Sequence, residues 1–138
     1  MRILLCHNYY QQTGGEDYVF ADERQMLLDH GHEIVEYTRH NDDIKSMNRA
    51  ALATQTIWNR RTFREVRELL RRHQVDLVHC TNTFPLISPA VYDAAKAERV
   101  PVVQALHNYR LLCANGQFMR NGATCEACLG KTTWRAVV

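Results

Sequence analysis

The residues of this sequence that could do chemistry lie at the ends of short apolar runs. His107 ends one such run, where an imidazole could hydrogen-bond a hydroxyl or transfer a proton near neutral pH. We take His107 as the candidate catalytic residue, although a histidine at a strand end more often bonds a backbone carbonyl. The residues expected to line a binding crevice with it are His79, Asn82, Asn108, Tyr109 and Arg110.

Gly14 and Gly15 precede an expected helix and form the candidate anion site. Unpaired backbone N–H groups and the helix dipole attract phosphate at a helix start, and glycine lets the backbone approach a ligand closely. Glu16 falls in the first turn, where a carboxylate favours the dipole and could also accept hydrogen bonds from ligand hydroxyls. The alternative is that the two glycines only form the turn.

Three cysteines have the spacing of metal ligands. Eleven residues separate Cys113 from Cys125, and the two-residue gap between Cys125 and Cys128 is usual in zinc sites. A tetrahedral structural zinc needs a fourth ligand, which could be His107 or a residue beyond position 138. The alternative is a set of reduced thiols that bind nothing.

Alternating strands and helices must position these groups. The expected strands are Ile3–Cys6, Glu33–Tyr37, Val75–Cys80 and Pro101–Leu106. The expected helices are Gly15–His30, which ends at Gly31, then Ile57–His73, and Ala90–Arg99, which Ser88-Pro89 begins. Residues 44–55 fit no single element. Apolar strands joined by helical crossovers predict an α/β fold, a parallel sheet with helices on both faces, and ligands bind such sheets beyond the carboxyl ends of the strands.

Length, charge and cysteine content exclude several classes of protein. A chain of 138 residues allows one domain. Seventeen Lys and Arg against fifteen Asp and Glu give a net charge of only +2, which argues against a general nucleic-acid binder. We find no secretory signal and no apolar run of the roughly 18 residues that a membrane span needs, so we expect a cytoplasmic protein. Its five cysteines then favour thiols or metal ligands over disulfides, with Cys6 and Cys80 in the core.

The helix expected at residues 57–73 carries a row of arginines. They are Arg60, Arg64, Arg67 and Arg71. Such a row could contact anionic lipid headgroups, which would allow peripheral association with the inner face of a membrane. Glu65 and Glu68 interrupt the positive charge, so we prefer a solvated helix face.

Strings spread in order along nearly the whole chain resemble the N-terminal half of retaining glycosyltransferases of family 4, which have the GT-B architecture. They are Met1–Leu5, His7–Tyr10, Gly14–Glu16, Gly31–Val35, Asp76–His79, Asn82–Pro85, Pro101–Arg110, and Cys113 with Cys125 and Cys128. The resemblance implies a Rossmann-like, acceptor-side domain. It also implies sugar transfer from a nucleotide-diphosphate sugar to a carbohydrate or lipid-linked acceptor, with retention at the anomeric carbon and no obligatory metal.

The resemblance also implies roles for single residues. The Gly14-Gly15 loop is similar to the one near the donor diphosphate and the acceptor. His107 is similar to the histidine that hydrogen-bonds the donor sugar at the reaction centre, and residues 108–110 would line the cleft beside it. These groups would position the reactants and stabilise charge on the leaving diphosphate. Thr81 departs from the pattern, because a second histidine is expected there, so acceptor contacts are not carried over to it.

The nucleotide-sugar-binding second domain of a GT-B enzyme is not found in these 138 residues. We therefore expect a fragment, a truncated gene product or half of a split enzyme. It should have little activity alone and should self-associate through an exposed sheet edge or domain face. The alternative function is a non-enzymatic Rossmann-like binding module whose structural zinc site docks a partner. A flavodoxin-like cofactor binder is disfavoured, because the first loop has no run of hydroxyl residues.

Overall fold

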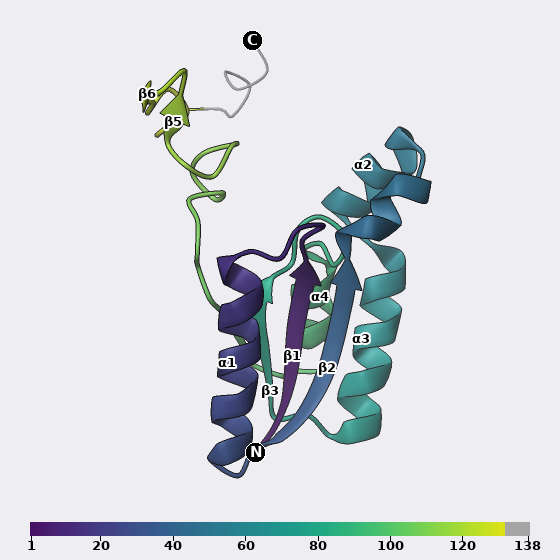
Figure 1. Cartoon of the computed structure of the whole chain (residues 1–138). Helices are drawn as coiled ribbons and strands as arrows, with labels where there is room; N and C mark the ends of the chain where they lie inside the picture. The colour runs from purple at the N-terminus through teal and green to yellow at the C-terminus, as the bar shows by residue number, and fades with distance from the viewer. Residues whose placement is uncertain (132–138) are drawn as a thin grey trace. The chain divides into compact units, whose positions relative to one another are not determined.

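The computed structural model describes residues 1–131 and contains two compact units, Met1–Ala105 (unit 1) and Leu106–Val138 (unit 2). Unit 1 holds a four-stranded parallel sheet (Figure 1). Its strands lie in the order β2 (Glu33–His40), β1 (Arg2–Tyr9), β3 (Leu77–Asn82) and β4 (Val102–Gln104). Its helices are α1 (Gly15–Asp29), the 3-10 helix Asn41–Ser46, α2 (Arg49–Ile57), α3 (Arg60–His73) and α4 (Ala90–Ala97). Unit 2 holds an antiparallel hairpin of β5 (Met119–Arg120) and β6 (Ala123–Thr124).

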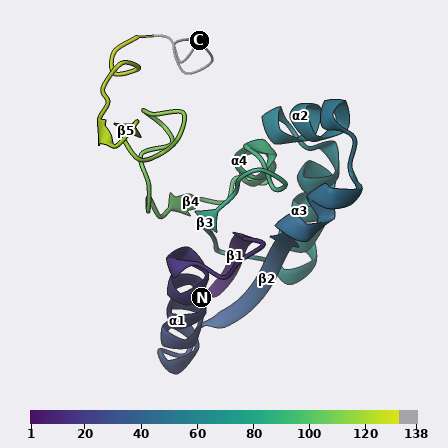
Figure 2. The same cartoon turned by 45° about the horizontal axis from the view of Figure 1, so that its top comes forward.

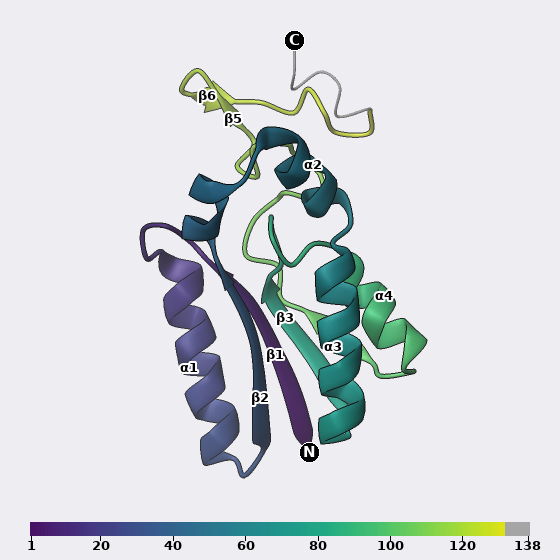
Figure 3. The ribbon, with the colours of Figure 1, turned by 90° about the vertical axis from the view of Figure 1, so that its right-hand side faces the viewer.

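Helices cover both faces of the sheet, because successive apolar residues of β1 point to opposite sides. Ile3 and Leu5 pack with Phe20 of α1. Leu4 and Cys6 face the other way, into the core shared with α3 and α4. Figures 2 and 3 show α1 on one side of the sheet and α3 and α4 on the other. The predicted α/β fold, a Rossmann-like parallel sheet between helices, is confirmed.

The strand order reverses beside β1. From β1 the chain passes through α1 to β2 on one side, and from β2 it returns through α2 and α3 to β3 on the other side. Because these strands pair in parallel, the carboxyl ends of β1 and β3 lie next to each other. Ligands bind open α/β sheets at such a reversal. The segments that follow β1 and β3 therefore form the candidate site of unit 1.

The first two strands are longer than predicted, because their parallel ladder continues through polar residues to the pair Tyr9 and His40. The sequence predicts His7 and Asn8 just after β1, but both lie within it and are fully buried. Apolar patterning misses this extension because each of these polar side chains finds a hydrogen-bond partner inside the protein.

The last two strands also differ from their predicted bounds, because β3 contains a bulge. It lies between Cys80 and Asn82, where Thr81 has no partner on β1. The ladder between β3 and β4 ends at Gln104. The prediction that His107 closes this strand is therefore wrong, since His107 lies beyond its end and belongs to unit 2.

The helix predicted at Ile57–His73 is present, but it begins three residues later than predicted. α2 ends at Ile57 and α3 begins at Arg60, with Asn59 between them as the N-cap residue. The Asn59 side-chain oxygen accepts the N–H groups of Arg61 and Thr62 at 2.9 and 3.2 Å. This cap fixes the start of α3 at Arg60.

Two predicted helix boundaries are confirmed. Gly31 follows α1 with φ +77°, a left-handed conformation that favours glycine. Ser88 Oγ accepts the N–H of Ala90 at 3.3 Å, at the start of α4. Within residues 1–131, no helix is both long enough and apolar enough to cross a lipid bilayer.

Candidate functional site

The loop after β1 enters α1 through two glycines that the fold does not require. Gly14 is the N-cap residue with φ −117° and ψ −179°, and neither Gly14 nor Gly15 has a positive φ. A Cβ on Gly14 would touch the Tyr10 ring at 3.7 Å, an ordinary contact distance, and a Cβ on Gly15 would meet nothing within 4 Å. Both positions therefore leave bare backbone at a helix start. Because Asp17 accepts the N–H of Gly14, the N–H of Gly15 is the one that an anion can approach.

A buried pair of side chains fixes this loop. Asp17 Oδ2 accepts the backbone N–H of Gly14 at 2.8 Å, and Oδ1 lies 2.7 Å from Nε2 of His7. His7 is fully buried, Asp17 is 5% exposed, and Phe20 stacks on the imidazole with ring centroids 4.6 Å apart. Within the described part of the chain, His7 Nδ1 is buried without a hydrogen-bond partner. Through Asp17, the glycine loop is tied to the central strand.

The sequence analysis misses Asp17 and His7 as functional residues. A signal for Asp17 is present, because an acidic residue at the third position of a helix can bond back to the N-cap. No sequence pattern shows that a histidine of β1 shares the same carboxylate. Both residues act on the site through the position of Gly14.

Glu16 lies in the first turn of α1, as predicted. Its Oε2 accepts the Tyr10 hydroxyl at 2.7 Å, a bond that closes the loop across residues 10–16. The carboxylate also lies at the positive end of the helix dipole. Its contact with a ligand stays a prediction.

Asn82 ends β3 and uses both of its side-chain polar atoms within the protein. Its Nδ2 donates to the carbonyl of Asn8 at 2.8 Å, and its Oδ1 accepts the N–H of Phe84 at 3.1 Å. Asn8 Oδ1 accepts the N–H of Leu86 at 3.1 Å. Asn82 is 4% exposed, so its visible role is to hold the segment after β3 against β1.

His79 lies inside β3 and faces α1. Its Nε2 is 3.4 Å from Oε2 of Glu23, and Thr81 Oγ1 donates to the same oxygen at 3.4 Å. The structure therefore groups His79 with Glu23 and Thr81 on one face of the sheet. It does not place His79 beyond the end of the strand, where the sequence predicts a crevice.

The predicted catalytic residue and its neighbours lie together in unit 2. His107 is exposed and lines a hollow of about 420 Å³. The lining residues are Leu106, His107, Asn108, Tyr109, Leu111 and Leu112. Asn108 Oδ1 accepts the N–H of Arg110 at 3.0 Å, and the rings of Tyr109 and Phe118 are 5.0 Å apart. This hollow presents imidazole, amide and phenol groups on an apolar base.

All five cysteines are free thiols. Cys6 and Cys80 are buried in the core of unit 1, as predicted, and the hydrogen bond of the Cys6 thiol to Cys80, together with burial, raises the pKa of Cys6. The other three, Cys113, Cys125 and Cys128, line one hollow of about 340 Å³. Among residues 1–131, no three His, Cys, Asp or Glu side chains already stand in metal-binding positions. A zinc ion at these thiols stays a prediction.

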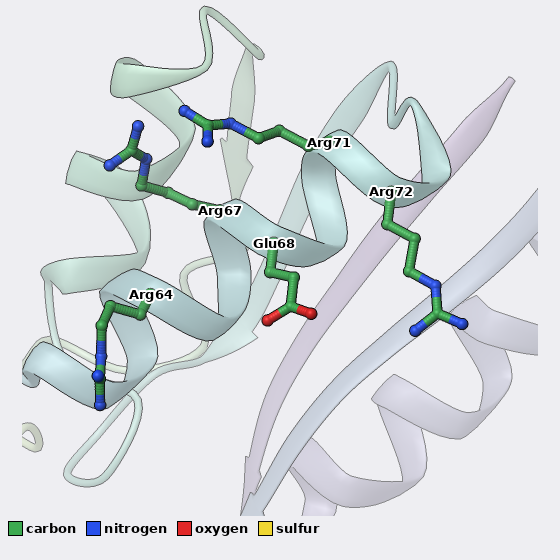
Figure 4. A pocket seen from close by; sticks show the side chains of 5 residues that line it. All are labelled: Arg64, Arg67, Glu68, Arg71 and Arg72. Carbon is green, nitrogen blue, oxygen red and sulfur yellow. The ribbon is translucent and has the colours of Figure 1, made fainter.

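The arginines of α3 line a surface groove. Its residues are Arg64, Arg67, Glu68, Arg71 and Arg72 (Figure 4). Arg67 and Arg71 bond Glu98 at 2.6 and 2.8 Å, and the hydrogen bonds from Arg71 and Arg67 lower the pKa of Glu98. One carboxylate thus engages two of the arginines and balances one of their positive charges. This pairing favours the predicted solvated face over a lipid contact.

Comparison with known protein families identifies one family that this chain matches. The model of the family described as Glycosyltransferase Family 4 matches residues 11–124, which is more than half of the chain. This range includes the glycine loop, the strands β2, β3 and β4, and the segment from His107 to Arg110. No curated protein matches the chain.

Proposed function

Because the chain belongs to glycosyltransferase family 4, we propose that it is the acceptor-side domain of a retaining glycosyltransferase of GT-B architecture. A sugar passes from a nucleotide-diphosphate sugar to a carbohydrate or lipid-linked acceptor. The reaction takes place in the cytoplasm, with peripheral contact to the inner face of a membrane where the acceptor is lipid-linked.

The observation that carries this proposal is the bare backbone at Gly14 and Gly15. Neither glycine is needed for a positive φ or for close packing inside the protein. They lie at a helix start that follows β1, beside the reversal of strand order. A ligand diphosphate supplies a reason for glycine that the fold does not, since it needs to reach the N–H of Gly15 past a backbone without side chains.

The residues of the site then take distinct roles. The N–H groups at the start of α1 and the helix dipole stabilise the negative charge on the leaving diphosphate. Glu16, held by Tyr10, accepts hydrogen bonds from sugar hydroxyls. His107 donates a hydrogen bond to the donor sugar, with residues 108–110 beside it. The proposal assigns no protein nucleophile and requires no catalytic metal.

We expect sugar transfer to need a donor-binding domain in addition to the described residues. Residues 1–131 contain one four-stranded parallel sheet, whereas a GT-B enzyme holds its donor mainly on a second Rossmann-like half. We expect the 138-residue chain to release almost no nucleoside diphosphate from a nucleotide sugar in a coupled assay. Turnover at an ordinary enzyme rate, about 10 per second, would contradict the proposal.

Gly15→Ala tests the diphosphate site with little risk to the fold, because its Cβ meets nothing within 4 Å. The methyl group would keep a diphosphate from the helix start. We expect the affinity for a nucleoside diphosphate, measured by calorimetry, to fall about tenfold, which is the loss of one charge-assisted hydrogen bond. Ala21→Ser, at an exposed position of the same helix, is the matched control. Equal affinities for Gly15→Ala and the wild type would exclude the loop as the site.

Self-association is the expected behaviour of the sheet edge. β4 is one of the two edge strands of this sheet, and its Val102 and Val103 are 36% and 48% exposed. An unpaired strand edge with apolar side chains tends to pair with another chain. We expect light scattering to show a mass that rises with concentration, and a monodisperse monomer throughout would contradict this part of the proposal.

A further inference from the structure

The second unit of the chain has very little apolar core. In residues 106–131, Cys113 and Gly116 are the buried residues, and the hairpin strands have two residues each. Most of its large apolar side chains are exposed by 45% or more, whereas Phe118 is half-buried. The exposed ones are Leu106, Tyr109, Leu111, Leu112, Met119 and Leu129. A piece of this size usually needs disulfides, a metal or a partner subunit to hold one structure.

Two turns and one hairpin bring the thiols of this unit to a common hollow. Cys113 opens a turn closed by the bond from the N–H of Gly116 to its carbonyl at 2.9 Å, with Gly116 at φ +75°. Cys125 extends the hairpin, since its N–H donates to the carbonyl of Phe118 at 2.7 Å. Cys128 follows after two residues. All three line the same hollow of about 340 Å³.

Cys113 is the buried thiol of the three. Its side chain is 7% exposed, and its sulfur donates a hydrogen bond to Oδ1 of Asn115 at 3.0 Å. A metal ion would replace this bond, because the thiolate is the form that binds metals. Cys125 and Cys128 are half-buried and line the same hollow.

We propose that Cys113, Cys125 and Cys128 bind one Zn²⁺ as thiolates, with a water molecule in the fourth position. Each thiol gives up its proton to solvent when the metal binds, so affinity should fall as the pH is lowered. The three sulfurs do not yet stand in metal-binding positions among the described residues, so binding includes closure of the two turns onto the ion. His107 lines a different hollow and is not a ligand.

A metal here would also order the segment that carries the proposed donor contacts. The N–H of Cys113 donates to the carbonyl of Tyr109 at 2.8 Å, and the N–H of Tyr109 donates to the carbonyl of Gly116 at 2.9 Å. The cysteine turn is thus bonded directly to residues 107–110. This consequence rests on the proposed function, whereas the metal site itself does not.

Cobalt titration of the reduced, metal-free chain tests the site, because Co²⁺ bound to thiolates has a sulfur-to-metal charge-transfer band. We expect one Co²⁺ per chain, a tetrahedral visible spectrum, and displacement by one equivalent of Zn²⁺. Loss of a group that supports a metal ligand costs roughly ten- to hundredfold in metal affinity. We expect a larger loss from each of the ligand variants Cys113→Ser, Cys125→Ser and Cys128→Ser. Glu126→Gln and Cys80→Ala are controls that should bind as the wild type does.

Two results would overturn the proposal. One is the absence of a charge-transfer band in the reduced wild type. This result counts against the site whether or not Cys125 and Cys128 form a disulfide in a separate, air-oxidised sample. The other is unchanged cobalt binding in the three serine variants. Amide NMR signals of unit 1 report whether each variant is folded, because its core does not involve these cysteines. Loss of the band in His107→Ala would instead make His107 the fourth ligand and contradict the assignment of water. Nucleotide binding is measured separately, so either proposal can fail alone.

Discussion

Residues 1–105 and residues 106–131 hold their candidate functional groups by different means. In unit 1, the glycine loop is bonded to Asp17, which contacts His7 in the middle of a packed sheet. In unit 2, residues 107–110 are held by backbone bonds of tight turns, and most large apolar side chains are exposed.

This difference shows what holds the candidate functional groups of each unit in position. A buried core fixes the loop of unit 1 before any ligand arrives. Unit 2 has turns and a hairpin but little buried surface, so its groups need an added constraint to hold one geometry. The proposed metal would supply that constraint at Cys113. The two units should therefore respond differently to core mutations and to chelators.

Phe20→Ala should give the largest effect and tests the core of unit 1. Phe20 is 1% exposed between α1 and the sheet, so the cavity should cost about 3 to 5 kcal/mol in the free energy of unfolding. Leu111→Ala in unit 2, where the side chain is 78% exposed, should change stability by less than about 0.5 kcal/mol. Urea unfolding measures both, and similar losses in the two variants would break the comparison.

Asp17→Ala should give the next largest effect. It leaves the N–H of Gly14 and the buried imidazole of His7 without their acceptor, at a cost of about 2 to 3 kcal/mol. Asp22→Ala, at an exposed position of the same helix, is the control and should change little. Hydrogen exchange at Gly14 should accelerate in Asp17→Ala. Wild-type exchange there would show that the pair does not fix the loop.

Glu65→Gln should give a smaller, pH-dependent effect and tests polar support within unit 1. Burial raises the pKa of Glu65, but hydrogen bonds from Arg61 and Tyr37 and the charge of Arg39 outweigh burial, so the pKa is lowered. A carboxylate with a lowered pKa stabilises the fold above its ordinary pKa, and this stabilisation is lost as the pH falls through the folded value.

We therefore expect Glu65→Gln to be less stable than the wild type by about 1 kcal/mol at neutral pH. The two proteins should converge once the pH falls below the lowered pKa of Glu65, where the carboxylate is protonated. Urea unfolding at several pH values measures the gap, and Glu68→Gln on the exposed face of α3 is the control. A gap that persists at low pH would mean that Glu65 acts through packing rather than charge.

The sequence predicts the fold well where local patterns and the core agree. Apolar runs at Ile3–Cys6 and Val75–Cys80 locate two strands, and Gly31 marks a helix end. The sequence prediction fails at the ends of the strands and at Asn59. The polar residues there form hydrogen bonds with partners that only the folded chain brings close. The bulge at Thr81 is a further example, since it depends on pairing between β1 and β3.

The candidate site is predictable in part. Gly14-Gly15 at a helix start and the shared hollow of the three cysteines follow from spacing alone. The link from His7 to Asp17 joins residues on different elements, and no periodicity shows it. His79 illustrates the reverse case, because a residue beside a predicted strand end turns toward Glu23 on α1 instead.

Amide NMR of the labelled chain, titrated with a nucleotide-diphosphate sugar, tests most directly that bare backbone at Gly14 and Gly15 binds the diphosphate. We predict that the signals of Gly14, Gly15 and Glu16 shift together and fit one dissociation constant. Shifts confined to the arginine groove at residues 64–72, with the signals of residues 14–16 unmoved, would contradict the account.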